Sequence, residues 1–276
     1  MDIKLIALDM DGTTLRDDKT MSQRNTKVLQ AAQARGIQIV PTTGRPKKMI
    51  PKPILDVGAI RYVITSNGAS VYDLEDNSIL YSNLMTEQES VKLIDFLAGY
   101  NLFVEAYCEG GSYTDRKDLP LISTFKNFPQ IYIDIIMESQ TFVDDMPGFL
   151  KRENKRIEKV NIPYLEPEVY VELIEKLRSM KEYAITSSFL QNIEINRATA
   201  NKGEALGRLC GHLGIRPEQV MAFGDGSNDF EMLKFAGCGV AMQNAIEPLK
   251  PVADFITRTN EEDGVAYAIQ KFLDFN

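Results

Sequence analysis

Two carboxylates lie two positions apart, Asp9 and Asp11, directly after an apolar run at residues 3–8. Gly12 follows them and lets the chain turn, so both side chains can lie near one point at the end of the run. Burying unpaired charge is costly, and the repulsion between the two carboxylates therefore favours a bound cation. Their hard oxygen donors indicate Mg²⁺. An EF-hand loop is excluded, because the glycine at its sixth position and the glutamate at its twelfth are absent.

A second acidic cluster follows the apolar run at residues 220–223. It contains Asp225, Asn228 and Asp229 together with two glycines. Its oxygen atoms could add metal ligands to the first pair if both runs are strands of one parallel sheet. Ligands bind at the edge of such a sheet where the carboxyl ends of its strands meet.

Two further segments have residue types that suit a phosphate group. Thr43 and Gly44 offer a hydroxyl and free backbone N–H groups at a turn, and Arg45 follows them. Lys202 opens a predicted helix, where a cation opposes the helix dipole and is mildly unfavourable unless an anion lies nearby. Each of these signals alone also fits an ordinary turn or a surface residue. Together with two acidic clusters they indicate one site.

The elements that must position these residues alternate between strand and helix. An alternation of buried apolar runs with helical patterns predicts a parallel sheet with right-handed crossovers, and hence an α/β, doubly wound, Rossmann-like core. Ser22 is placed to cap the first helix. The predicted strands are 3–8, 37–40, 62–65, 220–223, 239–242 and 255–257, and the later helices are 202–213, 230–236 and 264–273.

The order of predicted helices and strands is different in the middle of the chain. Thr86 and Glu89 form a capping box before a predicted helix, and strand candidates follow at 102–107 and 131–136. A second helix is predicted after Pro167, with more strand-like sequence from 183 to 195. Helices followed by paired strands predict an α+β insert on an antiparallel sheet. We expect this insert, a cap domain, at residues 84–187, and a catalytic core formed by 1–83 and 188–276.

Composition limits the classes of partner. The chain has 276 residues, 44% of them hydrophobic and 25% charged, which excludes a disordered protein or a coiled coil. Its 31 basic and 39 acidic residues give a net charge of −8, so neither a nucleic acid nor an anionic membrane surface is an expected partner. Three widely spaced cysteines fit no disulfide framework. Without a leader-like or spanning segment, we expect a cytoplasmic protein, as a monomer or weak homodimer.

The order of the motifs resembles that of the haloacid dehalogenase-like (HAD) hydrolases. The resemblance is carried by Asp9-x-Asp11-Gly12-Thr13, Thr43-Gly44-Arg45, Asn201-Lys202-Gly203 and Gly224-Asp225-Gly226-x-Asn228-Asp229. Within this family the sequence is most similar to the Cof-type sugar phosphatases, which have an α+β (type IIB) cap inserted after the third core strand. The segment Ser66-Asn67-Gly68-Ala69 also matches that branch. Pro41-Thr42 before Thr43 departs from the small residues that are more usual in the family.

The resemblance implies a Mg²⁺-dependent phosphoric monoester hydrolase that acts on a small phosphorylated metabolite such as a sugar phosphate. Asp9 would be the nucleophile, and Asp11 the acid and base. The metal ligands would be Asp9, the backbone carbonyl of Asp11, and Asp225. Asp229 would either bind the metal directly or contact the residues that do. The residues implied to bind the substrate are Gly12, Thr43, Gly44, Arg45, Lys202 and Asn228.

Three alternatives remain at this point. A sugar phosphomutase would share the aspartyl-phosphate but would have to protect it from water. A receiver domain also combines acidic residues, Thr and Lys, but its phosphoacceptor follows the third strand of a much shorter domain, unlike Asp9. A non-catalytic phosphosugar sensor is disfavoured because Asp9 and Asp11 are both present.

Overall fold

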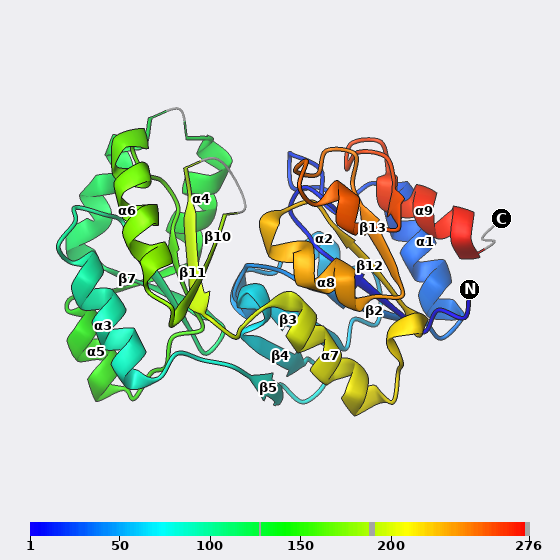
Figure 1. The fold of residues 1–276 in the computed structure, drawn as a ribbon, viewed down its shortest axis with the longest axis horizontal. Coiled ribbons are helices and arrows are strands. Elements are labelled where there is room, and N and C mark those ends of the chain that lie inside the picture. Colours follow the sequence, from blue (N-terminus) through cyan, green and yellow to red (C-terminus); the bar gives the residue numbers. More distant parts are fainter. Residues whose placement is uncertain (127, 188–190, 274–276) are drawn as a thin grey trace. The chain divides into compact units, whose positions relative to one another are not determined.

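The computed structural model describes residues 1–126, 128–187 and 191–273. Their contacts divide the chain into two compact units (Figure 1). The first unit contains residues 1–45, 50–82 and 201–276, and the second contains 46–49 and 83–200. Each unit has its own apolar core. Among the described residues, no helix combines the length and the apolar character needed to span a membrane.

The central sheet of the first unit is parallel and has five strands in the order β14-β13-β12-β1-β2. The register pairs Leu5 with Val220 and with Gln38, which places β1 between β12 and β2. β1 and β12 are buried along their whole length, as their continuous apolar sequence predicts. The strands are β1 (Leu5–Leu8), β2 (Gln38–Pro41), β12 (Val220–Gly224), β13 (Cys238–Ala241) and β14 (Phe255–Ile256).

Helices connect these strands and complete the α/β architecture predicted for the core. The helix α1 packs against α9, and α7 packs against α8 (Figure 1). The Ser22 side chain accepts a hydrogen bond from the backbone N–H of Asn25, which confirms the predicted cap of α1. The helices are α1 (Gln23–Ala34), α2 (Lys52–Leu55), α7 (Lys202–Leu213), α8 (Phe230–Phe235) and α9 (Gly264–Leu273).

The third predicted strand does not extend the parallel sheet along its length. β3 (Tyr62–Thr65) joins it through one parallel bridge, between Thr42 and Ile64. It then pairs antiparallel with β4 (Ser70–Asp73), which pairs with β5 (Ile79–Ser82). β3 and β4 are buried on both faces, so their sequences show no alternation that distinguishes a hairpin from a parallel strand.

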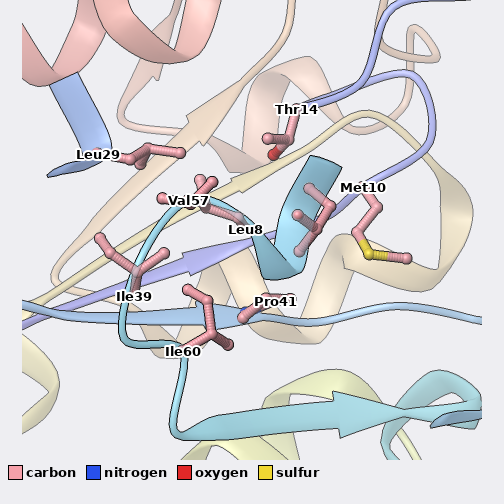
Figure 2. Close-up of a pocket in the computed structure, with 9 residues that line it drawn as sticks. Leu8, Met10, Thr14, Leu29, Ile39, Pro41, Val57 and Ile60 are labelled. Atoms are coloured by element: carbon pink, nitrogen blue, oxygen red, sulfur yellow. The ribbon is translucent and has the colours of Figure 1, made fainter. Parts of the chain in front are cut away.

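An apolar anchor lies between the two acidic residues of the first motif. Met10 is fully buried in a cluster with Leu15, Ile54 and Val63. Figure 2 shows it among nine residues that line a cavity of about 10 Å³ below the turn. The lining is apolar apart from the Thr14 hydroxyl, so this cavity has too few polar partners to hold a water molecule. Burial of Met10 fixes the backbone from which the flanking aspartates project.

The second unit is built on a six-stranded sheet of order β10-β11-β9-β6-β7-β8, which is antiparallel except for the β7–β8 pair. Its strands are β6 (Glu105–Cys108), β7 (Gly111–Asp115), β8 (Gln140–Val143), β9 (Lys159–Ile162), β10 (Tyr183–Thr186) and β11 (Ile193–Arg197). Its helices are α3 (Glu87–Leu97), α4 (Gln130–Ser139), α5 (Met146–Arg152) and α6 (Pro167–Ser179). The capping box of Thr86 and Glu89 forms as predicted.

The two faces of this sheet differ in chemistry. Alternate residues such as Ala106, Val160 and Ile195 join the apolar core with α3, α5 and α6. The residues between them are polar yet buried, among them Glu105, Lys159, Asn161, Glu194 and Asn196. Lys159 donates to Glu194 at 2.7 Å, and Asn161 donates to Glu105. Burial raises the pKa of Glu105 to about 7, although Asn161 and Lys159 oppose this change.

Two features of the insert differ from the sequence expectation. Residues 131–136, predicted as a strand from their isoleucines, lie in α4, which begins directly after Pro129. Proline suits a helix N-terminus, and this favours the helix over the β-branched preference. The core was expected to resume at 188. Residues 188–190 lie outside the described part, but β11 pairs with β9 and β10, which keeps 193–197 in the second unit.

Candidate active site

Asp9 follows β1 and is fixed by backbone hydrogen bonds on the first unit's sheet. Its backbone N–H donates to the carbonyl of Phe223 on β12 at 3.0 Å, and its carbonyl accepts from the Thr14 hydroxyl at 2.6 Å. The backbone N–H groups of Thr14 and Leu15 both donate to the Met10 carbonyl, which closes the turn. Gly12 has φ +79°, a conformation that glycine adopts without strain.

Lys202 meets the first acidic cluster from the N-terminus of α7. Its side chain is fully buried, and its Nζ lies 2.5 Å from Asp9 Oδ1 and 2.6 Å from Asp229 Oδ1. Burial alone would lower the pKa of this ammonium, but the carboxylates of Asp229 and Asp9 outweigh burial and raise it. Lys202 is therefore a fixed positive charge at the position where the helix dipole alone disfavours one.

The loop after β12 brings the second acidic cluster to the same point. Asp229 Oδ2 accepts from the backbone N–H groups of Asp225 and Gly226, both at 2.9 Å, which holds the loop closed. Asp225 Oδ1 accepts from the Thr13 hydroxyl at 2.6 Å. Burial raises the pKa of Asp225 to about 7, and the charge of Asp229 adds to this. Asp9 of the first predicted cluster thus lies in one group with Asp225 and Asp229 of the second.

The group contains a set of carboxylates that could hold a metal ion. Asp9, Asp225 and Asp229 each offer an oxygen, and these atoms lie within 4.8 Å of one another. Burial raises the pKa of Asp9, with Lys202 opposing the rise and the other two carboxylates adding to it. A bound cation would relieve this crowding of negative charge. A Cβ at Gly12 would lie 2.4 Å from Asp225 Oδ2, so glycine keeps this space open.

The Asp11 side chain lies outside this carboxylate set and has its own partners. Arg45 binds both of its oxygens, with Nε and Nη2 each at 2.8 Å, and Lys19 Nζ lies 2.9 Å from its Oδ1. Burial alone would raise the pKa of Asp11, but Arg45 and Lys19 hold it well below its usual range. The sequence suggested that both motif carboxylates could lie near one point. The structure instead gives them separate cations.

The remaining predicted residues lie in the same unit. The Thr43 hydroxyl accepts from the backbone N–H of Arg45 at 3.0 Å, and this orients the turn that contains Gly44. The Asn228 side-chain amide donates to Asn67 Oδ1 at 2.8 Å, which joins the loop after β12 to the segment after β3. β2 ends at Pro41, and Thr43, two residues later, is buried.

Sequence reasoning missed two side chains that complete this arrangement. Lys19 was not singled out, because it lies in a polar turn with no motif of its own. Asn244 was also missed, although its side chain donates to the Gly12 carbonyl at 2.8 Å. Thr13, quoted only as part of a motif, holds Asp225. Two features of the sequence could have drawn attention to Lys19. It lies eight residues after Asp11, and it occupies a position in a polar turn where glycine is more usual.

Comparison with known proteins agrees with this geometry. The family model of the haloacid dehalogenase-like hydrolases matches residues 6–269. Two phosphatases of Bacillus subtilis named for 5-amino-6-(5-phospho-D-ribitylamino)uracil, YcsE and YitU, are 33% and 32% identical to this chain. The alignments cover 99% and 98% of this chain and 97% of each relative.

Solved structures of the same family share the fold. A haloacid dehalogenase-like hydrolase from B. subtilis is 27% identical and covers 98% of this chain and 100% of its own, with a TM-score of 0.87. A sugar phosphatase of HAD subclass IIB is 25% identical over 99% of this chain and 100% of its own, with a TM-score of 0.82.

The family match and the curated relatives together confirm the resemblance drawn from the four motifs. A receiver domain and a non-catalytic sensor are the less consistent alternatives, since the relatives over nearly the whole chain are named as phosphatases. This chain belongs to the haloacid dehalogenase-like hydrolase family, in which its neighbours include subclass IIB phosphatases, and it is a phosphatase.

Proposed function

We propose that the protein hydrolyses small phosphate monoesters with Mg²⁺ and forms an aspartyl-phosphate on Asp9. The observation that carries this proposal is the convergence of Asp9, Asp225 and Asp229 around the buried Lys202. A carboxylate and a phosphate oxygen at 4 Å repel by roughly 4 kcal/mol per unit-charge pair at an effective dielectric near 20. A nucleophilic carboxylate therefore needs cations beside it, and this site provides one and has the ligands for another.

We assign Asp9 and Asp225 as the side-chain ligands of Mg²⁺, together with the backbone carbonyl of Asp11. When bound there, Mg²⁺ supplies charge neutralisation for the transferring phosphoryl group. We propose that Asp229 does not bind Mg²⁺ directly, because Lys202 and two backbone N–H groups already engage both of its oxygens. Its role is to hold Lys202 and the loop that presents Asp225.

The proposed reaction has two steps, the transfer of the phosphoryl group to Asp9 and the hydrolysis of the aspartyl-phosphate. In the first, an oxygen of Asp9 attacks phosphorus, the bond to the leaving oxygen breaks, and protonated Asp11 gives that oxygen its proton. In the second, a water attacks phosphorus, Asp11 takes a proton from it, and the bond to Asp9 breaks to release phosphate. Lys202, Thr43 and the Gly12–Gly44 backbone hold the non-bridging oxygens.

The protonation of Asp11 fits this sequence of steps. In the substrate-free protein, Arg45 and Lys19 hold Asp11 ionised, which is the form that accepts a proton from water. A phosphate dianion bound beside Asp9 would add negative charge near the Asp11 carboxylate. That charge raises the pKa of Asp11 and favours the protonated form that the first half-reaction needs.

We further propose that the second unit acts as the cap and contacts the organic part of the substrate. Its polar sheet face offers hydrogen-bonding side chains of the kind that a hydroxyl-rich leaving group requires. Sugar phosphates and ribityl phosphates, such as the substrate in the names of two relatives, are the first compounds to test.

The test is phosphate release from phosphorylated metabolites and 4-nitrophenyl phosphate, with and without Mg²⁺. We expect Asp9→Asn to abolish turnover and Asp11→Asn to slow both half-reactions, while circular dichroism stays that of the wild type. Asp56→Asn, an exposed aspartate at the end of α2, is the matched control and should change neither. Turnover by Asp9→Asn, or equal rates with and without Mg²⁺, would refute the proposal.

A further inference from the structure

Lys19 occupies a backbone position that disfavours lysine. The segment from Arg16 to Thr20 is a tight turn, in which Arg16 N donates to Thr20 O and Lys19 N donates to Arg16 O, both at 2.9 Å. Lys19 is its last loop residue and has φ +65°. Loops of this kind place a left-handed residue there, and glycine is the usual choice because a Cβ is strained.

The strained lysine points its amine at the acidic motif. Its side chain is only 12% exposed, and its Nζ lies 2.9 Å from Asp11 Oδ1. Arg45 engages the same oxygen with Nη2 and the other oxygen with Nε. The guanidinium fork sets the plane of the carboxylate, and the ammonium adds a contact from a different segment of chain. Strain that is retained where a side chain meets a reactive group is typical of a functional position.

We propose that Lys19 is a positioning residue for this phosphatase, which holds the Asp11 carboxyl group where it exchanges a proton with the leaving oxygen. The inference rests on the proposed role of Asp11 in proton transfer. Lys19 acts through Asp11 and contacts neither the phosphorus nor the nucleophile. A turn with glycine at position 19 would fold with less strain but would leave Asp11 held by Arg45 alone.

The experiment uses two aryl esters of similar size, phenyl phosphate and 4-nitrophenyl phosphate, with full-length protein and Mg²⁺. Phenolate is the poorer leaving group and depends more on a proton donor. Removal of the Lys19 charge by itself raises the pKa of Asp11 and favours the proton donor, but we expect the loss of positioning to outweigh this effect. Lys19→Gly should lower kcat/KM at least about tenfold for phenyl phosphate and less than about threefold for 4-nitrophenyl phosphate. KM should stay within twofold of the wild type, and Lys19→Arg should restore most of the loss.

Stability separates this role from a purely structural one. Lys19→Gly relieves the left-handed strain. Its melting temperature should therefore be no lower than that of the wild type, and at most about 2–4 °C higher. Lys19→Met keeps the Cβ and loses the amine, so it should share the kinetic defect without the gain. Lys4→Met, which removes an exposed lysine paired with Asp2, is the matched control. It should leave kcat/KM for both esters unchanged.

The outcomes separate this inference from the function on which it rests. Full activity of Asp9→Asn refutes the nucleophile, whatever the Lys19 variants do. If Asp9→Asn is inactive and Asp11→Asn shows leaving-group dependence, equal losses on both esters in Lys19→Gly overturn the positioning role. An unchanged or faster Lys19→Gly enzyme overturns it as well. In the double variant with Asp11→Asn, the Lys19→Gly change should have no further effect.

Discussion

Alanine substitutions at Gly12 and Gly36 separate the effect of a steric clash in the site from the effect of backbone strain. Both have a left-handed backbone, with φ of +79° and +80°. A Cβ at Gly12 would lie 2.4 Å from Asp225 Oδ2, whereas a Cβ at Gly36 meets no atom within 4 Å. Alanine at either position therefore has the same backbone strain, about 1–2 kcal/mol. Only Gly12→Ala forces Asp225 to move.

The required movement can be estimated from these distances. Ordinary contact begins near 3.4 Å, so the Asp225 carboxylate must shift by about 1 Å, which is 3.4 minus 2.4. A misplacement of about 1 Å in a catalytic site costs about a hundredfold in rate. We expect both alanine variants to melt about 2–8 °C below the wild type, and only Gly12→Ala to lose about a hundredfold in kcat/KM and to need more Mg²⁺.

The assay is phosphate release from 4-nitrophenyl phosphate across a Mg²⁺ titration, beside thermal unfolding of both variants. Gly36→Ala should keep wild-type kinetics at temperatures where it is folded. A Gly12→Ala enzyme with wild-type kcat/KM and Mg²⁺ dependence would show that Asp225 does not need its observed position, and the metal assignment would be wrong. Equal kinetic losses in both variants would show that strain, not the clash, is responsible.

Two further predictions concern buried charge. Lys202→Met leaves Asp9 and Asp229 without their shared ammonium, so urea denaturation should show a loss of about 3–5 kcal/mol, with no phosphate release; stability near that of the wild type would contradict this. Glu105 has its pKa raised to about 7 in the fold, from 4.5. The folded state therefore binds its proton more tightly than the unfolded state, and this contribution to stability is complete below pH 4.5 and is lost as pH rises through 7. The difference of 2.5 units corresponds to about 3 kcal/mol, and Glu105→Gln should flatten this part of the pH–stability curve; an unchanged slope would refute it.

The positions of the site residues could be predicted because each follows a buried strand or opens a helix. Asp9 and Asp225 follow two apolar runs that pair in one sheet, so their proximity was implied by the parallel topology. The separate partners of Asp11 could not be predicted. They depend on Arg45, whose side chain reaches back across the turn, and on Lys19, whose backbone conformation overrides the usual preference of its turn.

The insert was predicted less well than the core, for physical reasons. The isoleucines of residues 131–136 favour a strand locally, but Pro129 directly before α4 favours a helix start there. In the core, the antiparallel hairpin of β3 and β4 is buried on both faces, so its sequence showed no polar–apolar alternation that distinguished it from a parallel strand. The division at Ala200 is fixed by pairing of β11 with β9, a contact between residues more than thirty positions apart.

The central claim is that Asp9 itself carries the phosphoryl group during turnover. The direct measurement is acid quenching of the wild-type enzyme during steady-state hydrolysis with Mg²⁺, followed by mass spectrometry of the peptide that contains residues 5–16. We predict one added phosphoryl group on Asp9, which hydroxylamine removes and which Asp9→Asn lacks. Continued turnover with the phosphoryl group on another residue, or with no trapped intermediate under burst conditions, would contradict the account.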